Sequence, residues 1–208
     1  GPDLVVVQKN AANLAERLSV LRQNVLELDH DTIPGIYRSL ETLGRALGAE
    51  SKAAAATARI RAELERVRAL TAALPRRRVM FVVGRNPGTL QNVIAVGSSS
   101  YLNEIIELAG GENVFRSSVG AYPKVSLEEI LARNPEVIVD MGEMAQTVGV
   151  TEAQKQAVAA LWHRYPVLAA ARNGRVFAVA SDIFVVPGPR VVEAAREFAR
   201  MLHPEARL

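Results

Sequence analysis

The stretch that decides the fold runs from Ser51 to Pro75 and reads SKAAAATARIRAELERVRALTAALP. Up to Leu74 it contains neither Pro nor Gly, and Ala, Leu, Arg and Glu, which are strong helix formers, dominate it. Ser51 is suited to cap a helix and Pro75 to stop one. We therefore predict one helix about 35 Å long, enough to cross a small domain.

The apolar residues of this helix fall on one side. Ile60, Leu64, Val67 and Leu74 lie near one stripe, and the other side carries Arg and Glu. This pattern is typical of an amphipathic helix packed on a globular body, not of a buried or membrane helix.

Strands and helices alternate on both sides of the long helix. A second helix, capped by Thr32 and ended by Gly48, precedes it. Alternation of this kind indicates a parallel, layered α/β fold. The expected strands are 4–7, 24–28, 78–83, 92–96, 113–115, 136–139 and 175–179, and the expected helices besides those two are 13–21, a segment ending near 109, 126–133, 151–161 and 190–202. Leu4 to Val7 is expected to be fully buried.

The composition limits the chemistry. The chain has 208 residues, 49% of them hydrophobic, and no cysteine, which excludes disulfides, thiolate metal sites and a cysteine nucleophile. The net charge is +3, and the one basic cluster, Arg76 to Arg78, indicates a solvated strand entry rather than a nucleic-acid surface. No apolar run reaches membrane-spanning length, and the chain opens on a strand without a signal peptide.

No reactive constellation is found. Walker, GxGxxG and HExxH motifs are missing, and His30, His163 and His203 are too scattered to predict a metal site. Carboxylates after strands, at Asp140, Glu143 and Asp182, are more often caps or turn formers than catalysts. The residues therefore indicate binding rather than catalysis.

Several segments together resemble the class III periplasmic binding proteins, the solute-binding subunits of ABC importers for cobalamin, ferric siderophores or haem. They are Pro2-Asp-Leu-Val5, Arg78 to Gly88, Ala109 to Phe115, Val125 to Val139 and Ser181 to Arg190. The resemblance implies two α/β lobes of parallel sheet flanked by helices and joined by a long backbone helix. The divisions would be 1–31 for a partial N-terminal lobe, 32–75 for the helices including the interlobe helix, and 76–208 for the C-terminal lobe.

Family members carry a signal segment or lipobox and the first half of the N-terminal lobe before this Pro-Asp-Leu-Val. The resemblance therefore implies a periplasmic or lipid-anchored protein, and an N-terminal lobe that is incomplete here and packs on the long helix or on a second copy of the chain.

The resemblance also implies a ligand site between the lobes, with no catalytic residue, no resident metal and no covalent cofactor. The cargo would be a metal chelate, with a cobalamin-like corrinoid favoured. By position the contacts are Gln8, Lys9 and Asn10 in one lobe, and Asn86, Tyr122, Met141, Gly142, Glu143 and Ile183 to Val186, including Phe184, in the other. Tyr122 would offer a flat ring to a corrin or pack in the core.

A carboxylate siderophore or haem would need several cations, for which Lys9, Arg85 and Lys124 are the candidates. Glu128 matches the exposed Glu that docks on the permease in this family, although an acidic residue also suits a helix N-terminus by itself. Two other readings stay open: a chelatase-like assembly enzyme, which would need His or Cys ligands in the cleft, and a self-associating fragment without a ligand. Nucleic acid is not an expected partner.

Overall fold

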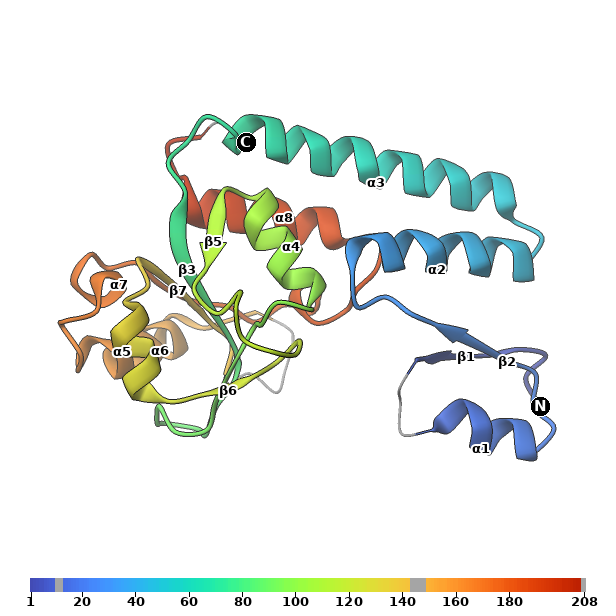
Figure 1. The fold of residues 1–208 in the computed structure, drawn as a ribbon, viewed down its shortest axis with the longest axis horizontal. Coiled ribbons are helices and arrows are strands. Elements are labelled where there is room, and N and C mark those ends of the chain that lie inside the picture. Colours follow the sequence, from blue (N-terminus) through green and yellow to red (C-terminus); the bar gives the residue numbers. More distant parts are fainter. Residues whose placement is uncertain (10–12, 143–148, 207–208) are drawn as a thin grey trace.

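The computed structural model of this chain describes residues 1–9, 13–142 and 149–206. It is an α/β structure with two separate sheets (Figure 1). A small sheet of two strands lies at the N-terminal end, a pair of long helices follows, and a six-stranded sheet with helices on both faces forms the rest.

The small sheet is a β-α-β unit. Strands β1 (Val5–Gln8) and β2 (Val25–Leu28) pair in parallel, and helix α1 (Leu14–Val20) connects them. Within β1 only Val7 is buried, and Val6 is 47% exposed. The prediction of a fully buried first strand is therefore wrong. Helix α1 packs mainly against β2, so β1 is not covered on both faces.

Helices α2 (Ile33–Ala46) and α3 (Glu50–Thr71) run side by side in opposite directions (Figure 1). Thr32 caps α2 as predicted, since its Oγ1 accepts a hydrogen bond of 3.1 Å from the amide of Gly35. Ser51 is not the cap of α3, which begins one residue earlier. The turn after Gly48, with φ at +61°, and the bond of 2.7 Å from the Ala49 amide to the Gly44 carbonyl bring the chain into the helix sooner.

Helix α3 confirms the prediction of one long helix with a single buried side. Its 22 residues span about 33 Å. Ile60, Leu64 and Val67 are buried as predicted, together with Thr57 and Thr71. The helix contacts α8 (Val191–Leu202) and α4 (Tyr101–Leu108). The helix ends at Thr71, before the predicted Leu74, where the Thr71 hydroxyl donates to the Leu108 carbonyl at 3.0 Å.

The large sheet has the strand order β6-β4-β3-β7-β8, with β5 also paired to β3. The α/β class is confirmed, but the sheet is mixed rather than parallel. Strands β5, β7 and β8 are parallel to the neighbours they pair with, whereas β4 pairs antiparallel with β3 and with β6. The cause is the short turn between β3 and β4, which can join only antiparallel neighbours. The strands are β3 (Arg77–Gly84), β4 (Val93–Ala95), β5 (Gly111–Asn113), β6 (Lys124–Val125), β7 (Val137–Asp140) and β8 (Val176–Ala178).

Two hydrophobic cores lie on opposite faces of this sheet. Along β3, Val79 and Phe81 belong to one core, and Met80 and Val82 to the other, as alternation in a strand requires. The first core includes α3, α4 and α8, and the second includes α5, α6 and α7 (Figure 1). The helices are α4 (Tyr101–Leu108), α5 (Leu127–Arg133), α6 (Glu152–His163), α7 (Ala169–Arg172) and α8 (Val191–Leu202). A 3-10 turn, η1 (Asp182–Phe184), lies between β8 and α8.

Among residues 1–9, 13–142 and 149–206, no helix combines the length and the apolar character that a membrane crossing requires.

Candidate functional site

A pocket of about 230 Å³ lies between the two sheets. Gln8 at the end of β1 and Asp31 just after β2 contribute from the small sheet. The large sheet contributes the residues before and at the start of α4, the loop before β6 and the segment after η1. These lining residues are Ser99, Ser100, Tyr101, Ala121, Tyr122, Val185 and Pro187. The pocket therefore depends on both parts of the molecule.

Tyr122 is the large exposed aromatic of this pocket. It is 49% exposed, so it is not packed in the core, and its hydroxyl lies 3.3 Å from the Ser100 Oγ. Ser100 also caps α4 by accepting a bond of 3.2 Å from the Leu102 amide, so the ring is fixed from one side by a helix cap. This gives the pocket a flat apolar face with its polar end secured.

Tyr101 also lines the pocket. It is buried, and its hydroxyl donates to the Phe184 carbonyl at 3.1 Å. Burial raises the pKa of the Tyr101 phenol well above its ordinary value, with a smaller contribution from Tyr122. Tyr101 is therefore a neutral hydrogen-bond donor that joins α4 to the segment after β8.

The structure places the other predicted contacts in different surroundings. Lys9 is exposed, with its Nζ 3.5 Å from Asp29 Oδ2. Asn86 is exposed in the turn after β3, where its Oδ1 accepts from Asn92 Nδ2 at 3.2 Å, and it does not line this pocket. Met141 lies in the core, and the Gly142 amide donates to Asp140 Oδ1 at 2.8 Å. Asn10 and Glu143 fall outside the described residues.

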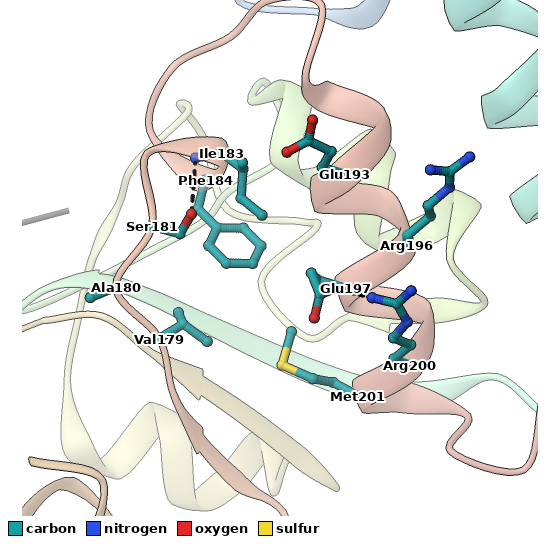
Figure 2. Close-up of a pocket in the computed structure, with 10 residues that line it drawn as sticks. All are labelled: Val179, Ala180, Ser181, Ile183, Phe184, Glu193, Arg196, Glu197, Arg200 and Met201. Atoms are coloured by element: carbon teal, nitrogen blue, oxygen red, sulfur yellow. Dashed lines mark hydrogen bonds and ion pairs between the residues drawn. The ribbon is translucent and has the colours of Figure 1, made fainter. Parts of the chain in front are cut away.

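Ile183 and Phe184 line a second pocket, of about 450 Å³, beside α8 (Figure 2). Both are buried, and Figure 2 shows them with Val179 on the side of the pocket that faces α8. From α8 come four charged side chains and the apolar Met201. The charges compensate one another, because Arg196 pairs with Glu63 of α3 and Arg200 pairs with Glu197. Val185, the next residue along the chain, faces the first pocket instead.

Few free cations are found around the first pocket among the residues that the structure describes. Arg85, one of the three candidates, has a side chain with no exposed surface, and its Nε binds the Asp140 carboxylate at 2.9 Å. It is therefore not a cleft cation. Lys9 is close to Asp29, and Asp31 adds a carboxylate to the lining. The described lining thus does not favour a ligand with many carboxylates.

The buried cluster around Asp140 was not foreseen. Asp140 forms a turn, as the sequence indicates, because its Oδ1 accepts from the Gly142 amide at 2.8 Å. It also accepts bonds from Arg85 and from Trp162 Nε1, the latter at 2.7 Å. The sequence signal that could have revealed this ion pair is an Arg immediately after one buried strand and an Asp at the end of another. His203 is the C-cap residue of α8 and is buried, with its Nε2 3.4 Å from the Gly110 carbonyl. Within the described part of the chain no cluster of potential metal ligands is found.

Glu128 is exposed at the second position of α5. A capping box is present beside it: Ser126 Oγ accepts from the Glu129 amide at 3.2 Å, and Glu129 Oε2 accepts from the Ser126 amide at 2.9 Å. Because Glu129 serves the cap, Glu128 is left as the acidic side chain that this helix end presents to solvent.

Two α/β parts are thus connected through a long helix, and a pocket lies between them. The family described as periplasmic binding protein matches residues 1–183. This chain belongs to that family, whose members bind solutes rather than catalyse reactions.

Curated relatives are consistent with this assignment. The vitamin B12-binding protein of Vibrio parahaemolyticus is 28% identical over 199 residues, which cover 94% of this chain and 66% of that protein. The cobalamin-binding protein of Halobacterium salinarum is 29% identical over 211 residues, covering 97% of this chain and 53% of that protein. The chain thus spans about half to two thirds of the length of these two relatives.

Solved structures share the fold. An ABC transporter substrate-binding protein from Listeria monocytogenes superposes with a TM-score of 0.83 at 20% identity, covering 98% of this chain and 77% of that one. The periplasmic vitamin B12-binding protein of Vibrio cholerae gives 0.75 at 24% identity, with 98% and 74% covered. A periplasmic haem-binding protein from Pseudomonas aeruginosa gives 0.79 at 22% identity, with 99% and 74% covered. At these identities the likeness concerns the fold alone.

Proposed function

We propose that this chain is the solute-binding part of an ABC importer, and that it takes a corrinoid of the cobalamin type between its two sheets. The observation that carries the proposal is the pocket to which Gln8 and Asp31 contribute from one sheet and Tyr122 and Val185 from the other. A ligand held there would contact both parts at once. We further propose residues 1–31, 32–75 and 76–208 as the functional divisions of the chain, and an extracytoplasmic location.

The charges around the pocket support a corrinoid over the alternatives. Haem and carboxylate siderophores carry anionic groups that arginines bind best, in paired hydrogen bonds. The described lining offers Asp31, neutral hydroxyl and amide groups and the ring of Tyr122 instead. A corrin surrounded by neutral amides suits this set better. The fold shared with a haem-binding protein keeps haem as the second candidate.

Equilibrium dialysis tests the proposal. The chain is dialysed against cyanocobalamin, haemin and a ferric hydroxamate, each followed by its own visible absorbance. Trp162 does not line the pocket, so its fluorescence is a poor first readout. Binding of cyanocobalamin in preference to haemin is expected, and binding of none of the three would overturn the proposal.

Substitutions locate the site. Tyr122→Ala removes the flat face and is expected to weaken cyanocobalamin binding about three- to tenfold, the equivalent of one aromatic contact. Gln8→Ala tests the contribution of the small sheet in the same assay. Val167→Ala is the matched control, because Val167 is 62% exposed and lies outside the pocket. Equal affinities for Tyr122→Ala and the control would place the ligand elsewhere.

We also propose that Glu128 takes part in docking on the permease. Its exposure at the start of α5 supports this, since a permease could reach it without any change in the fold. Glu128→Gln is expected to reduce stimulation of the transporter ATPase and to leave ligand affinity unchanged. Glu152→Gln, at the first turn of α6, is the control for loss of an exposed acidic residue at a helix N-terminus. The same ATPase stimulation by both variants would argue against docking through Glu128.

A further inference from the structure

The small sheet is covalently joined to the rest of the chain only through the segment that leads from β2 into α2 (Figure 1). This segment is fixed to α2. Ser39 Oγ donates to the Asp29 carbonyl at 2.9 Å, and a Cβ at Gly35 would lie only 2.8 Å from the same carbonyl oxygen. The end of β2 is therefore held close against the first two turns of α2.

The first turn of α2 is in turn held by Glu104, a residue of α4. Glu104 Oε2 accepts a hydrogen bond of 3.1 Å from the Ile33 amide. The first amides of a helix have no acceptor within the helix. Among the first three residues of α2, Gly35 donates to Thr32 and Pro34 has no amide hydrogen, so Glu104 supplies the acceptor for the third. A carboxylate also suits the positive end of the helix dipole.

Both ends of this hydrogen bond lie beside the pocket of about 230 Å³ between the two sheets. Asp31, two residues before Ile33, lines the pocket from the small sheet. Tyr101, three residues before Glu104 and therefore on the same side of α4, lines it from the large sheet. The bond thus joins the two walls of the pocket within one helical turn of residues that line it.

Apolar packing alone would not fix this arrangement. Ile33, Ile36 and Tyr37 of α2 belong to the same hydrophobic core as Leu102 and Ile105 of α4. Burial of apolar surface holds two helices together without a preferred direction. A hydrogen bond has a defined length and angle. Glu104 therefore adds orientation to an attachment that the core provides.

We propose that Glu104 is a positioning residue of the binding site, which sets the place of the small sheet relative to the large one through the Ile33 amide. Glu104 holds the first turn of α2, and α2 holds the end of β2. Gln8 and Asp31 are thereby placed opposite Tyr122. Glu104 itself does not line the pocket, so it acts through α2. This inference deepens the proposed function and rests on it for its link to the ligand.

The distance between two spin labels tests the positioning directly. The chain has no cysteine, so Val20→Cys in α1 and Gln156→Cys in α6, both at exposed residues, provide the only two labelling sites. Glu104→Ala removes the acceptor and keeps a strong helix former. We expect the distance distribution to widen and its mean to shift in Glu104→Ala. In Glu104→Gln it should stay as in the wild type, because the amide oxygen can still accept from the Ile33 amide.

Glu107→Ala is the matched control. Glu107 lies one turn further along α4 and accepts a hydrogen bond of 3.2 Å from Asn103 of the same helix. Glu104→Leu, which keeps the bulk of the side chain, is the second variant in case Glu104→Ala does not fold, and circular dichroism shows which variants fold. An unchanged distribution in the folded variant, or equal widening in Glu107→Ala, would overturn the positioning role.

Dialysis against cyanocobalamin tests the link to the ligand. The affinity is expected to fall about three- to tenfold in Glu104→Ala, the equivalent of one hydrogen bond, and to be unchanged in Glu104→Gln and Glu107→Ala. If the wild type binds no chelate while Glu104→Ala alone widens the distribution, the proposed function is wrong and the attachment through Glu104 holds. If the wild type binds cyanocobalamin and Glu104→Ala, with a wider distribution, binds it equally well, the role of Glu104 in the site is refuted.

Discussion

Replacing Phe184 by alanine tests whether this residue belongs to the core or to the ligand site. The Phe184 ring is 3% exposed and meets Phe81 and Phe198 edge to face, with centroid distances of 5.7 and 5.4 Å. Phe81 and Phe198 meet each other at 5.4 Å, so the three rings form a closed triangle. Removing one ring leaves a cavity that the other two cannot fill without losing their own contact.

The expected loss in free energy of unfolding is about 3–5 kcal/mol for Phe184→Ala. Of this, the two edge-to-face contacts account for about 0.5–1.5 kcal/mol each. Phe184→Leu refills most of the cavity and should lose little more than those contacts, about 1–3 kcal/mol. Val185→Ala, at a neighbouring residue that is 44% exposed, should change stability by less than about 0.5 kcal/mol.

Urea unfolding followed by Trp162 fluorescence and by circular dichroism measures these differences, since the chain has a single tryptophan, which is fully buried. A loss below about 1 kcal/mol for Phe184→Ala would refute the core assignment. A fall in cyanocobalamin affinity in a fully folded Phe184→Leu would return Phe184 to the ligand contacts expected from the sequence.

Three further outcomes are expected. Burial, ahead of the nearby Glu107 charge and against the hydrogen bond from the Ile33 amide, raises the pKa of Glu104. The folded state therefore holds this proton more tightly than the unfolded state, and the stability it gives is lost as the pH rises above the ordinary value of 4.5. The wild type should therefore lose stability relative to Glu104→Gln when the pH rises from 4 to 7, because glutamine does not titrate. A difference in urea midpoint between the two proteins that is the same at pH 4 and at pH 7 would contradict this. Gly44→Ala should lower the free energy of unfolding by about 1–3 kcal/mol, because a Cβ there would lie 2.5 Å from the Ala53 Cβ, between α2 and α3. Thermal unfolding measures this loss, with Arg45→Ala, at an exposed neighbouring residue, as the control. Ser126→Ala should lose about 0.5–2 kcal/mol with the cap of α5, and an unchanged melting temperature would show that the capping box adds nothing.

Local patterns in the sequence predicted much of the fold. The cap at Thr32 is present as predicted, because a cap depends on residues three apart. The stripe Ile60, Leu64 and Val67 identified the buried side of α3, because the helical period is fixed by the backbone. Signals of this kind need no knowledge of distant neighbours.

The remaining errors concern pairings between distant residues. Arg85 and Asp140 are 55 positions apart and meet only because β3 and β7 are neighbours in the sheet, so Arg85 was placed in the cleft. The exposure of Val6 depends on what covers its face of the small sheet, which its own run of valines does not indicate. The contacts around the first pocket were anticipated in part, at Gln8, Tyr122 and Val185, through resemblance rather than through the residues alone.

The central strand of the large sheet has a consequence for synthesis of the chain. Val79 to Val82 of β3 are fully buried and need three partner strands, yet β7 begins 53 residues after β3 ends at Gly84. At about 5–20 residues per second, a ribosome exposes this strand for about 3–10 s before β7 emerges. Arg77 and Arg78 are the first two residues of this strand and Arg76 precedes them, and charged residues at such positions oppose pairing between nascent chains. We therefore expect the basic cluster to oppose pairing of this strand with other chains during the interval in which the sheet cannot yet form.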